Sequence, residues 1–512
     1  MIERQIIIAL IVSTEFCQRI EDRWNIILFE SSTAKRIATW VNEYFKKYNK
    51  APQKEIESIF YQKLKAGLPK DLAAEIEEEI LPSLSEQYET EELNVDYLVD
   101  QAIFYFNERH LKKHSEEITR LLEAGKQLEA EKIANSYKPI AKDSGQWIDL
   151  SDKKVLDKLD HAFNKSTDVL ITFPGALGKF LNEFLIRCGF VTLMGPSKRG
   201  KTFWLLEFAM KACKQKRNVA FFQAGDMTED EQLMRISIHL TKKSNKEQFC
   251  GKMFEPVCDC IFNQLNKCDR SERACDYGIF EGKSEKWLRK EVTMDDLKTE
   301  YQDNKDYIPC NRCDAFENNK WGTPWIKEVH IKNPLTSDEA KDAFGEFFIK
   351  YSRRFKLSSH TNNTLTVRQI KSILTIWEKQ ENFIPDVIII DYADLLTDEI
   401  QKEERPKQNA VWKDLRGLSQ SAHALIITAT QSDADSFEKD TITLKNFSED
   451  KRKWDHVTAA WGLNQDHTGR EKDIGIMRLN ELLAREGDFS AKHQVHVLQN
   501  LRRGRPFIGS YW

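Results

Sequence analysis

Residues 195–202, with the sequence GPSKRGKT, have the residue types and spacing of a phosphate-binding loop (P-loop). Its members are Gly195, Pro196, Ser197, Lys198, Arg199, Gly200, Lys201 and Thr202. The glycines let backbone amides turn toward phosphate oxygens, the lysine brings charge to the β and γ phosphates, and the threonine hydroxyl can bind Mg²⁺. An apolar segment precedes the loop and a helical segment follows it, as this motif requires. The segment therefore predicts a site for ATP and Mg²⁺.

Two aspartates are candidates for the acidic groups that such a loop needs. Asp391 ends the apolar run VIIID, where a carboxylate can hold the hydration shell of Mg²⁺; an aspartate that only caps the strand is the alternative. Tyr392 follows it, so the adjacent position offers no carboxylate to activate water. Asp226 follows another apolar run, VAFFQ, and is the predicted catalytic base.

Cysteines are concentrated in one part of the chain, since seven of the ten lie within residues 250–313. A structural Zn²⁺ site usually has four thiolates and at least one C-x2-C pair, which Cys310 and Cys313 provide. Free thiols are the alternative, while disulfides are not expected in a cytoplasmic protein. The predicted zinc ligands are Cys260, Cys268, Cys310 and Cys313, with Cys258 and Cys275 as substitutes.

Three arginines, Arg502, Arg503 and Arg505, lie between two segments that have strand patterns. HQVHVLQNL alternates apolar and polar residues before them, and FIGSYW after them is rich in β-branched and aromatic residues. The pattern predicts a hairpin that carries the arginines, as opposed to a solvated basic segment. The arginines of such a hairpin can bind DNA or acidic neighbours.

The elements that position these residues indicate an α/β protein with a mainly parallel central sheet. GFVTLMG, NVAFFQAG, DVIIIDYA and HALIITATQ are short apolar runs separated by helical segments, which is typical of buried parallel strands. Residues 1–137 are instead helical by periodicity, and residues 138–171 form a linker with an amphipathic helix that docks on its own domain or on a neighbouring subunit. Residues 172–512 form the ATPase domain, which carries a Cys-rich insert at 242–330.

Composition sets few limits on function. The 512 residues carry a formal net charge of -4, so a nucleic-acid partner must be held by local basic loops and not by the overall field. The apolar run at residues 6–12 is too short to span a bilayer and has no cleavage site after it. We therefore expect a cytoplasmic protein with no membrane partner.

The order of these motifs resembles the RecA-like core of DnaB-family replicative helicases. GPSKRGKT, VAFFQAGDMTEDEQL, DVIIIDYADLL, LIITATQSDAD and LQNLRRGRPFIG occur in that order, and the resemblance covers about residues 150–512. It implies a homohexamer that encircles single-stranded DNA and uses ATP to unwind duplex from 5′ to 3′, with a primase and a helicase loader as partners. A RecA-like DNA-binding ATPase without unwinding activity, such as a loader or a recombinase, is the alternative.

The resemblance also implies residue roles. Lys201 and Thr202 would bind nucleotide and Mg²⁺, Asp391 would act on the Mg²⁺ side, and Gln431 would sense the γ phosphate. Asp226 lies where the family has a glutamate as base, and Arg502 lies at the position of an arginine that reaches the neighbouring subunit's nucleotide. The three cations at the position of the DNA-binding loop are Lys451, Arg452 and Lys453. Acidic neighbours make a solvated loop the alternative there.

Overall fold

The computed structural model describes residues 2–21, 25–77, 81, 95–137, 140, 159, 168–313, 321–352, 354–398, 404–446, 451–485, 490 and 492–512. The chain divides into two compact units, Met1–Asp160 and His161–Trp512. The helix expected in the linker falls outside the described residues, apart from Leu159. Among the described residues, no helix has both the length and the apolar character that a membrane span needs.

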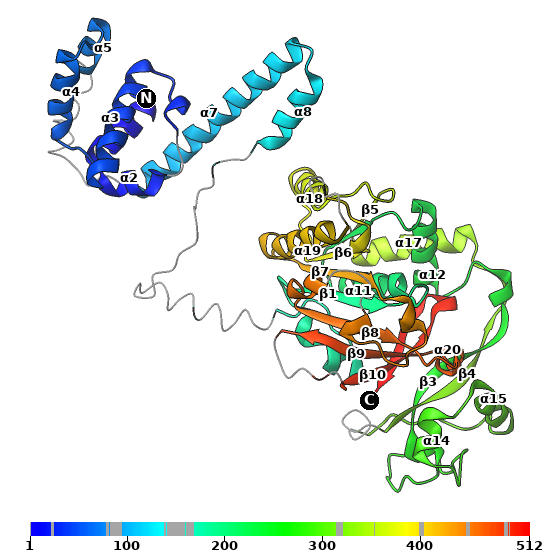
Figure 1. The fold of residues 1–512 in the computed structure, drawn as a ribbon. Helices are drawn as coiled ribbons and strands as arrows, with labels where there is room; N and C mark the ends of the chain where they lie inside the picture. Colours follow the sequence, from blue (N-terminus) through cyan, green and yellow to red (C-terminus); the bar gives the residue numbers. More distant parts are fainter. Residues whose placement is uncertain are drawn as a thin grey trace. The chain divides into compact units, whose positions relative to one another are not determined.

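The described part of the first unit is helical (Figure 1). Its elements are α1 (Ile2–Val12), α2 (Thr14–Ile20), η2 (Ile26–Leu28), α3 (Ser32–Tyr48), α4 (Glu55–Lys65), α5 (Lys70–Glu75), α7 (Val95–Glu123) and α8 (Gln127–Ser136). Ser31 caps α3 by accepting hydrogen bonds from two backbone amides of its first turn. Ile37, Val41 and Phe45 bury one face of α3, whereas Tyr48 at its end is 53% exposed.

A nine-stranded sheet forms the centre of the second unit as described, in the order β11-β10-β9-β8-β1-β7-β6-β2-β5 (Figure 1). The strands are β1 (Phe190–Gly195), β2 (Val219–Gln223), β5 (Phe355–Ser359), β6 (Val387–Asp391), β7 (Leu425–Gln431), β8 (Ala459–Asn464), β9 (Ile476–Ala484), β10 (Gln494–Asn500) and β11 (Arg505–Tyr511). Strands β8, β1, β7, β6, β2 and β5 pair in parallel, while β9, β10 and β11 add an antiparallel edge. The four strands predicted from apolar runs are β1, β2, β6 and β7, which confirms the mainly parallel sheet.

Helices cover both faces of this sheet. The helices of this unit outside the insert are α10 (Gly175–Leu181), α11 (Lys201–Lys214), α12 (Glu229–Thr241), α17 (Ser337–Tyr351), α18 (Val367–Glu381), α19 (Glu404–Ser421) and α20 (Arg470–Ile474), and the 3-10 turns are η4 (Asn182–Phe184), η5 (Glu247–Phe249), η6 (Ala393–Leu395), η7 (Ala434–Phe437), η8 (Leu444–Asn446), η9 (Lys451–Asp455) and η10 (Leu501–Arg503). Val191 and Leu193 of β1 share one core with Trp204 of α11, whereas Phe190 and its alternate neighbours face a second core that contains Trp412 of α19. Burial of β1 on both faces explains why its sequence is continuously apolar.

The insert is a two-stranded antiparallel ribbon with a small helical cap. β3 (Gly251–Cys260) pairs with β4 (Gly322–Ile331), and between them lie α13 (Ile261–Gln264), α14 (Glu285–Lys290) and α15 (Met294–Asp303). The ribbon packs on the antiparallel edge of the main sheet: a Cβ on Gly322 would lie 2.0 Å from Cβ of Tyr511, so only glycine fits there. Arg289 of α14 also donates a hydrogen bond to the carbonyl of Trp512. The insert is therefore anchored on β11.

Candidate nucleotide-binding site

The carboxyl ends of four parallel strands bring the predicted site residues to one edge of the sheet. Gly195, which ends β1 and begins the P-loop, is paired in register with Gln431 at the end of β7. Asp391 at the end of β6 is paired in register with Gln223 at the end of β2, three residues before Asp226. Ligands of open α/β sheets bind at this edge.

Lys201 lies at the first position of α11 and is buried, not exposed as a loop lysine would be. Its ammonium group donates hydrogen bonds to the carbonyls of Gly195, at 2.8 Å, and Pro196, at 3.0 Å. Burial lowers the pKa of Lys201 to about 8, although the charges of Asp394, Asp391 and Asp226 oppose this shift. Phosphate oxygens would replace the two carbonyls as acceptors when nucleotide binds.

The other P-loop residues divide between exposed positions and contacts within the protein. Ser197 and Lys198 are exposed, and Lys198 has a positive φ of 61°. Arg199 instead donates to the side chain of Gln465, at 3.0 Å, and so faces β8 and not the loop's interior. Gly200 has φ 88°, and a Cβ there would lie 2.8 Å from the side chain of Leu501. The turn that carries Arg502 therefore lies against the P-loop of its own chain.

Thr202 and Asp391 form the best-defined contact of the site. The threonine hydroxyl donates to Oδ1 of Asp391 at 3.2 Å, which joins the P-loop helix to the end of β6. Oδ2 of Asp391 is buried and has no hydrogen-bond partner among the described residues. Burial raises the pKa of Asp391 to about 6, and the bond from Thr202 acts in the opposite direction. A hydroxyl beside a buried, unpartnered carboxylate oxygen fits the ligand preferences of Mg²⁺.

Asp226 lies in the loop between β2 and α12 and is exposed. Its charge acts on both Lys201 and Asp391, which places its carboxylate within electrostatic range of the P-loop. Arg235 of α12 also acts on Asp391 and stacks on Phe203, with 5.1 Å between guanidinium and ring. The position of Asp226 is compatible with a base that acts on water beside a bound phosphate.

Asp394 is a site residue that sequence reasoning missed. Its carboxylate accepts hydrogen bonds from the hydroxyl of Thr430, at 2.7 Å, and the backbone amide of Gln431, at 3.3 Å, and it acts electrostatically on Lys201. It holds the end of β7, from which the Gln431 side chain donates to the hydroxyl of Tyr392 at 3.3 Å. A second aspartate three residues after Asp391 is the only sequence signal for it.

Lys453, predicted to contact DNA, is buried instead. Its ammonium group lies 2.8 Å from Oδ1 of Asp394 and 5.3 Å from the ring centroid of Trp412, and its side chain is 0% exposed. A lysine held this way is not available to a phosphate backbone, so the expectation for Lys453 is wrong in this structure. Arg452 in the same 3-10 helix is exposed, while the side chain of Lys451 lies outside the described residues.

The hairpin predicted around the three arginines is formed by β10, η10 and β11. Arg503 and Arg505 both bind the carboxylate of Glu255 on β3, at 2.9 Å and 2.5 Å, and Lys327 lies 3.6 Å from it. Glu255 is 0% exposed, so its charge is fully withdrawn from water and neutralised by these cations. Of the alternatives for Arg503 and Arg505, the structure shows an acidic neighbour.

Arg502 differs from the other two arginines. It is exposed, and its guanidinium lies 5.2 Å from the ring centroid of Phe249 in η5. Sequence reasoning missed both Glu255 and Phe249, because nothing in their own segments indicates that they meet a hairpin some 250 residues later. The insert thus binds Arg503 and Arg505 through the carboxylate of Glu255 and contacts Arg502 through the ring of Phe249.

The four cysteines predicted to bind zinc line one small pocket of the insert. All ten cysteines are free thiols. Within the described ranges, however, no group of three or more His, Cys, Asp or Glu side chains is arranged so that it could hold a metal ion. The structure therefore gathers these cysteines without confirming a metal site.

The second unit thus combines a mainly parallel sheet with a loop that has the sequence pattern of a phosphate-binding loop and lies at the carboxyl ends of the strands. No family model matches the sequence, and a search of curated proteins finds no match. Among solved structures, the chain is similar to one described as a DnaB-like replicative helicase and its interactions with primase, with a TM-score of 0.53 and 12% identity over 98% of each chain. A second solved structure, described as an ATPase domain, aligns with a TM-score of 0.43 and 12% identity, over 70% of this chain and 98% of that one. At this identity, the first similarity shows a shared DnaB-like helicase fold.

Proposed function

We propose that this protein is an ATP-dependent replicative DNA helicase that acts as a hexamer on single-stranded DNA and unwinds duplex from 5′ to 3′. The observation that carries the proposal is the hydrogen bond between Thr202 and Asp391 beside Lys201, at the strand ends of a DnaB-like fold. This arrangement has the parts that phosphoryl transfer needs.

Each site residue has a role in the proposed hydrolysis. Lys201 would move from the carbonyls of the P-loop to the β and γ phosphates, while Thr202 and Asp391 would hold Mg²⁺, which neutralises phosphate charge. Asp226 would accept a proton from the attacking water. Gln431, paired in register with Gly195, would contact the γ phosphate and transmit its loss to β7 and Asp394.

Arg502 would complete the site of an adjacent subunit. Arg503 and Arg505 are occupied by Glu255, which leaves Arg502 as the exposed cation of the turn. In a ring of identical subunits, such a cation can stabilise the charge that develops on the transferred phosphate of the neighbour. Hydrolysis would then depend on ring formation.

DNA contact would come from Lys451 and Arg452 at the start of η9. Backbone contacts by such cations neutralise phosphates and read no sequence, as a translocating helicase requires. Lys453 has no part in this contact, since it lies on Asp394. A primase and a helicase loader in the bacterial or phage-infected cytoplasm are the partners that we propose, and the similar helicase structure is one described with primase.

The nucleotide site is tested by ATPase measurements on the full chain with and without single-stranded DNA. We expect DNA-stimulated hydrolysis that Lys201→Ala removes, because alanine brings no charge to the phosphates. Lys214→Ala, which changes an exposed lysine at the other end of α11, is the matched control and should keep most of the activity. Near-normal turnover in Lys201→Ala would exclude this site as the seat of hydrolysis.

A further inference from the structure

The cysteines of the insert are sorted by the fold into two groups. Cys260 at the end of β3, Cys268 after α13, and Cys310 and Cys313 after α15 line one pocket. The other insert cysteines do not line it.

Those other cysteines have separate surroundings. Sγ of Cys258 lies 3.8 Å from the carbonyl of Ser510 on β11, and Cys275 lies beside Tyr277. Sγ of Cys250 lies 3.8 Å from the carbonyl of Lys246. Four thiols from three segments line this pocket while their sequence neighbours lie elsewhere, which favours a built site over a chance accumulation.

One buried carboxylate ties two of the segments together. Asp259 is 0% exposed, and its Oδ1 accepts the backbone N–H of Cys260 and of Cys310, each at 2.7 Å. Its Oδ2 accepts from the hydroxyl of Tyr307 at 2.7 Å and from Gln264 at 2.9 Å. These bonds fix where the backbones of Cys260 and Cys310 stand relative to each other, which is how proteins orient the ligands of a metal.

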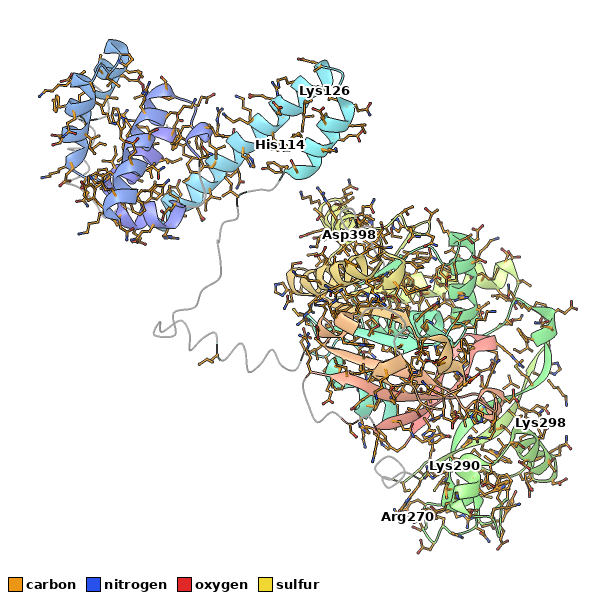
Figure 2. All side chains as sticks on the ribbon, in the orientation of Figure 1. His114, Lys126, Arg270, Lys290, Lys298 and Asp398 are labelled. Carbon is orange, nitrogen blue, oxygen red and sulfur yellow. The ribbon has the colours of Figure 1, made fainter. Side chains whose placement is uncertain are left out.

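An arginine holds the third segment. Arg273 donates to the carbonyl of Cys268 at 3.5 Å and to the backbone and side chain of Asn263, at 3.1 Å and 3.0 Å. Arg270 also lines the pocket, in the part of the insert that extends beyond the central sheet (Figure 2). Two cations beside four thiols complement the double negative charge that a tetrathiolate Zn²⁺ site carries.

Glu272 lines the pocket as well, but four thiolates already complete a tetrahedral shell, so a closed, structural site fits better than one with an open position.

We propose that Cys260, Cys268, Cys310 and Cys313 bind one structural Zn²⁺ that joins the two ends of the insert's cap. Binding would replace four S–H bonds by four Zn–S bonds and release four protons to solvent, and the sulfur atoms would have to close on the ion from their present positions. The proposal is independent of the nucleotide site, which lies on the main sheet.

The test is metal analysis of full-length protein purified without chelators. We expect about one equivalent of Zn²⁺ per chain, falling below about half an equivalent in Cys310→Ser and Cys313→Ser. Cys258→Ser and Cys275→Ser are the matched controls, since each removes an insert thiol outside the pocket, and they should retain the metal. Zinc-free protein, or equal loss in all four variants, would overturn the assignment.

A second measurement keeps the test independent of variant folding. Co²⁺ exchanged into unmodified protein should give the intense visible absorption and sulfur charge-transfer bands of a tetrahedral thiolate site. A thiol-blocking mercurial should release the metal, because it competes with the ion for the thiolates. A Co²⁺ spectrum without sulfur bands, or a disulfide among these cysteines by mass spectrometry, would contradict the proposal.

Discussion

The protonation of Lys201 should make ATP binding depend on pH. Its pKa of about 8 in the free protein means that part of the population is neutral above this pH, whereas bound phosphates favour the charged form. ATP binding should therefore take up protons, and affinity should fall as pH rises from about 8 toward the ordinary lysine value. Calorimetry at a pH of about 8.5 in buffers of different ionisation enthalpy measures the uptake directly.

Lys201→Arg is the control for this effect, because arginine stays charged throughout that pH range. Binding to that variant should be accompanied by little proton uptake, even if its affinity is lower. Equal uptake in both proteins would show that another group titrates, and an affinity of the unmodified protein that rises with pH would contradict the assignment of Lys201.

The proposed role of Asp226 as the catalytic base can be tested by a single substitution. Asp226→Asn should lower turnover by about 10²-fold or more and leave nucleotide affinity nearly unchanged, as expected for a base that does not bind the ground state. Asp230→Asn makes the same change at an exposed position in the first turn of α12 and should be near normal. Full activity of Asp226→Asn with an inactive Glu229→Gln would move the base to Glu229.

Sequence reasoning anticipated which residues lie together where their positions depend on local order along the chain. Thr202 and Asp391 could be paired in advance because a P-loop and a strand-ending aspartate meet at one sheet edge. The burial of Lys453 could not be predicted, because a sequence reveals the charge of a basic residue but not where its side chain points. Here the carboxylate of Asp394 holds the ammonium group inside the protein. Glu255 could not be predicted either, because its partners come from the far end of the chain.

At the scale of elements, the insert and the C-terminal hairpin act as one unit. Glu255→Gln keeps the shape of the side chain but leaves Arg503 and Arg505 without their counter-charge, with 15% and 27% of their side chains exposed. We expect a loss of about 2 to 4 kcal/mol in the free energy of unfolding, measured by urea denaturation of the full chain.

Glu328→Gln is the matched control on the opposite strand of the same ribbon. Glu328 pairs with Lys252 at 3.3 Å, but the two side chains are 36% and 71% exposed, so the loss should stay within about 0.5 kcal/mol. Equal effects of the two substitutions would mean that the buried cluster does not hold the hairpin.

The elements themselves were predictable to the extent that burial shapes their sequence. Strands buried on both faces, such as β1 and β6, are continuous apolar runs and were found, as was the hairpin of β10 and β11. The ribbon of β3 and β4 was not found, because polar residues, among them the buried Glu255 and Asp259 of β3, interrupt any apolar run. In the sequence, the cluster of cysteines distinguished the insert from the core, whereas the strands of the insert gave no signal.

At the scale of the whole molecule, the proposed helicase must share its nucleotide sites between subunits. Arg502→Ala protein should bind ATP but hydrolyse it slower by about 10³-fold or more, and mixing it with Lys201→Ala protein should restore part of the activity. Recovery is expected because some mixed interfaces pair an intact P-loop with an intact arginine.

Leu501 lies beside Gly200 of its own chain, so the mixing experiment also tests whether Arg502 acts on the P-loop of its own chain. If Arg502 serves the P-loop of its own chain, each mutant chain lacks one essential group and no mixture recovers. Absence of recovery in rings shown to exchange subunits would therefore assign Arg502 to its own chain and remove the argument for coupling between neighbours.

Strand separation is the central claim, and duplexes with a single-stranded tail at one end test it most directly. A labelled duplex with a single-stranded 5′ tail should be unwound in the presence of ATP and Mg²⁺, a duplex with only a 3′ tail should not, and Lys201→Ala should be inactive on both. DNA-stimulated ATP hydrolysis that separates neither substrate would contradict the helicase account and favour a DNA-binding ATPase that loads or assembles on the strand.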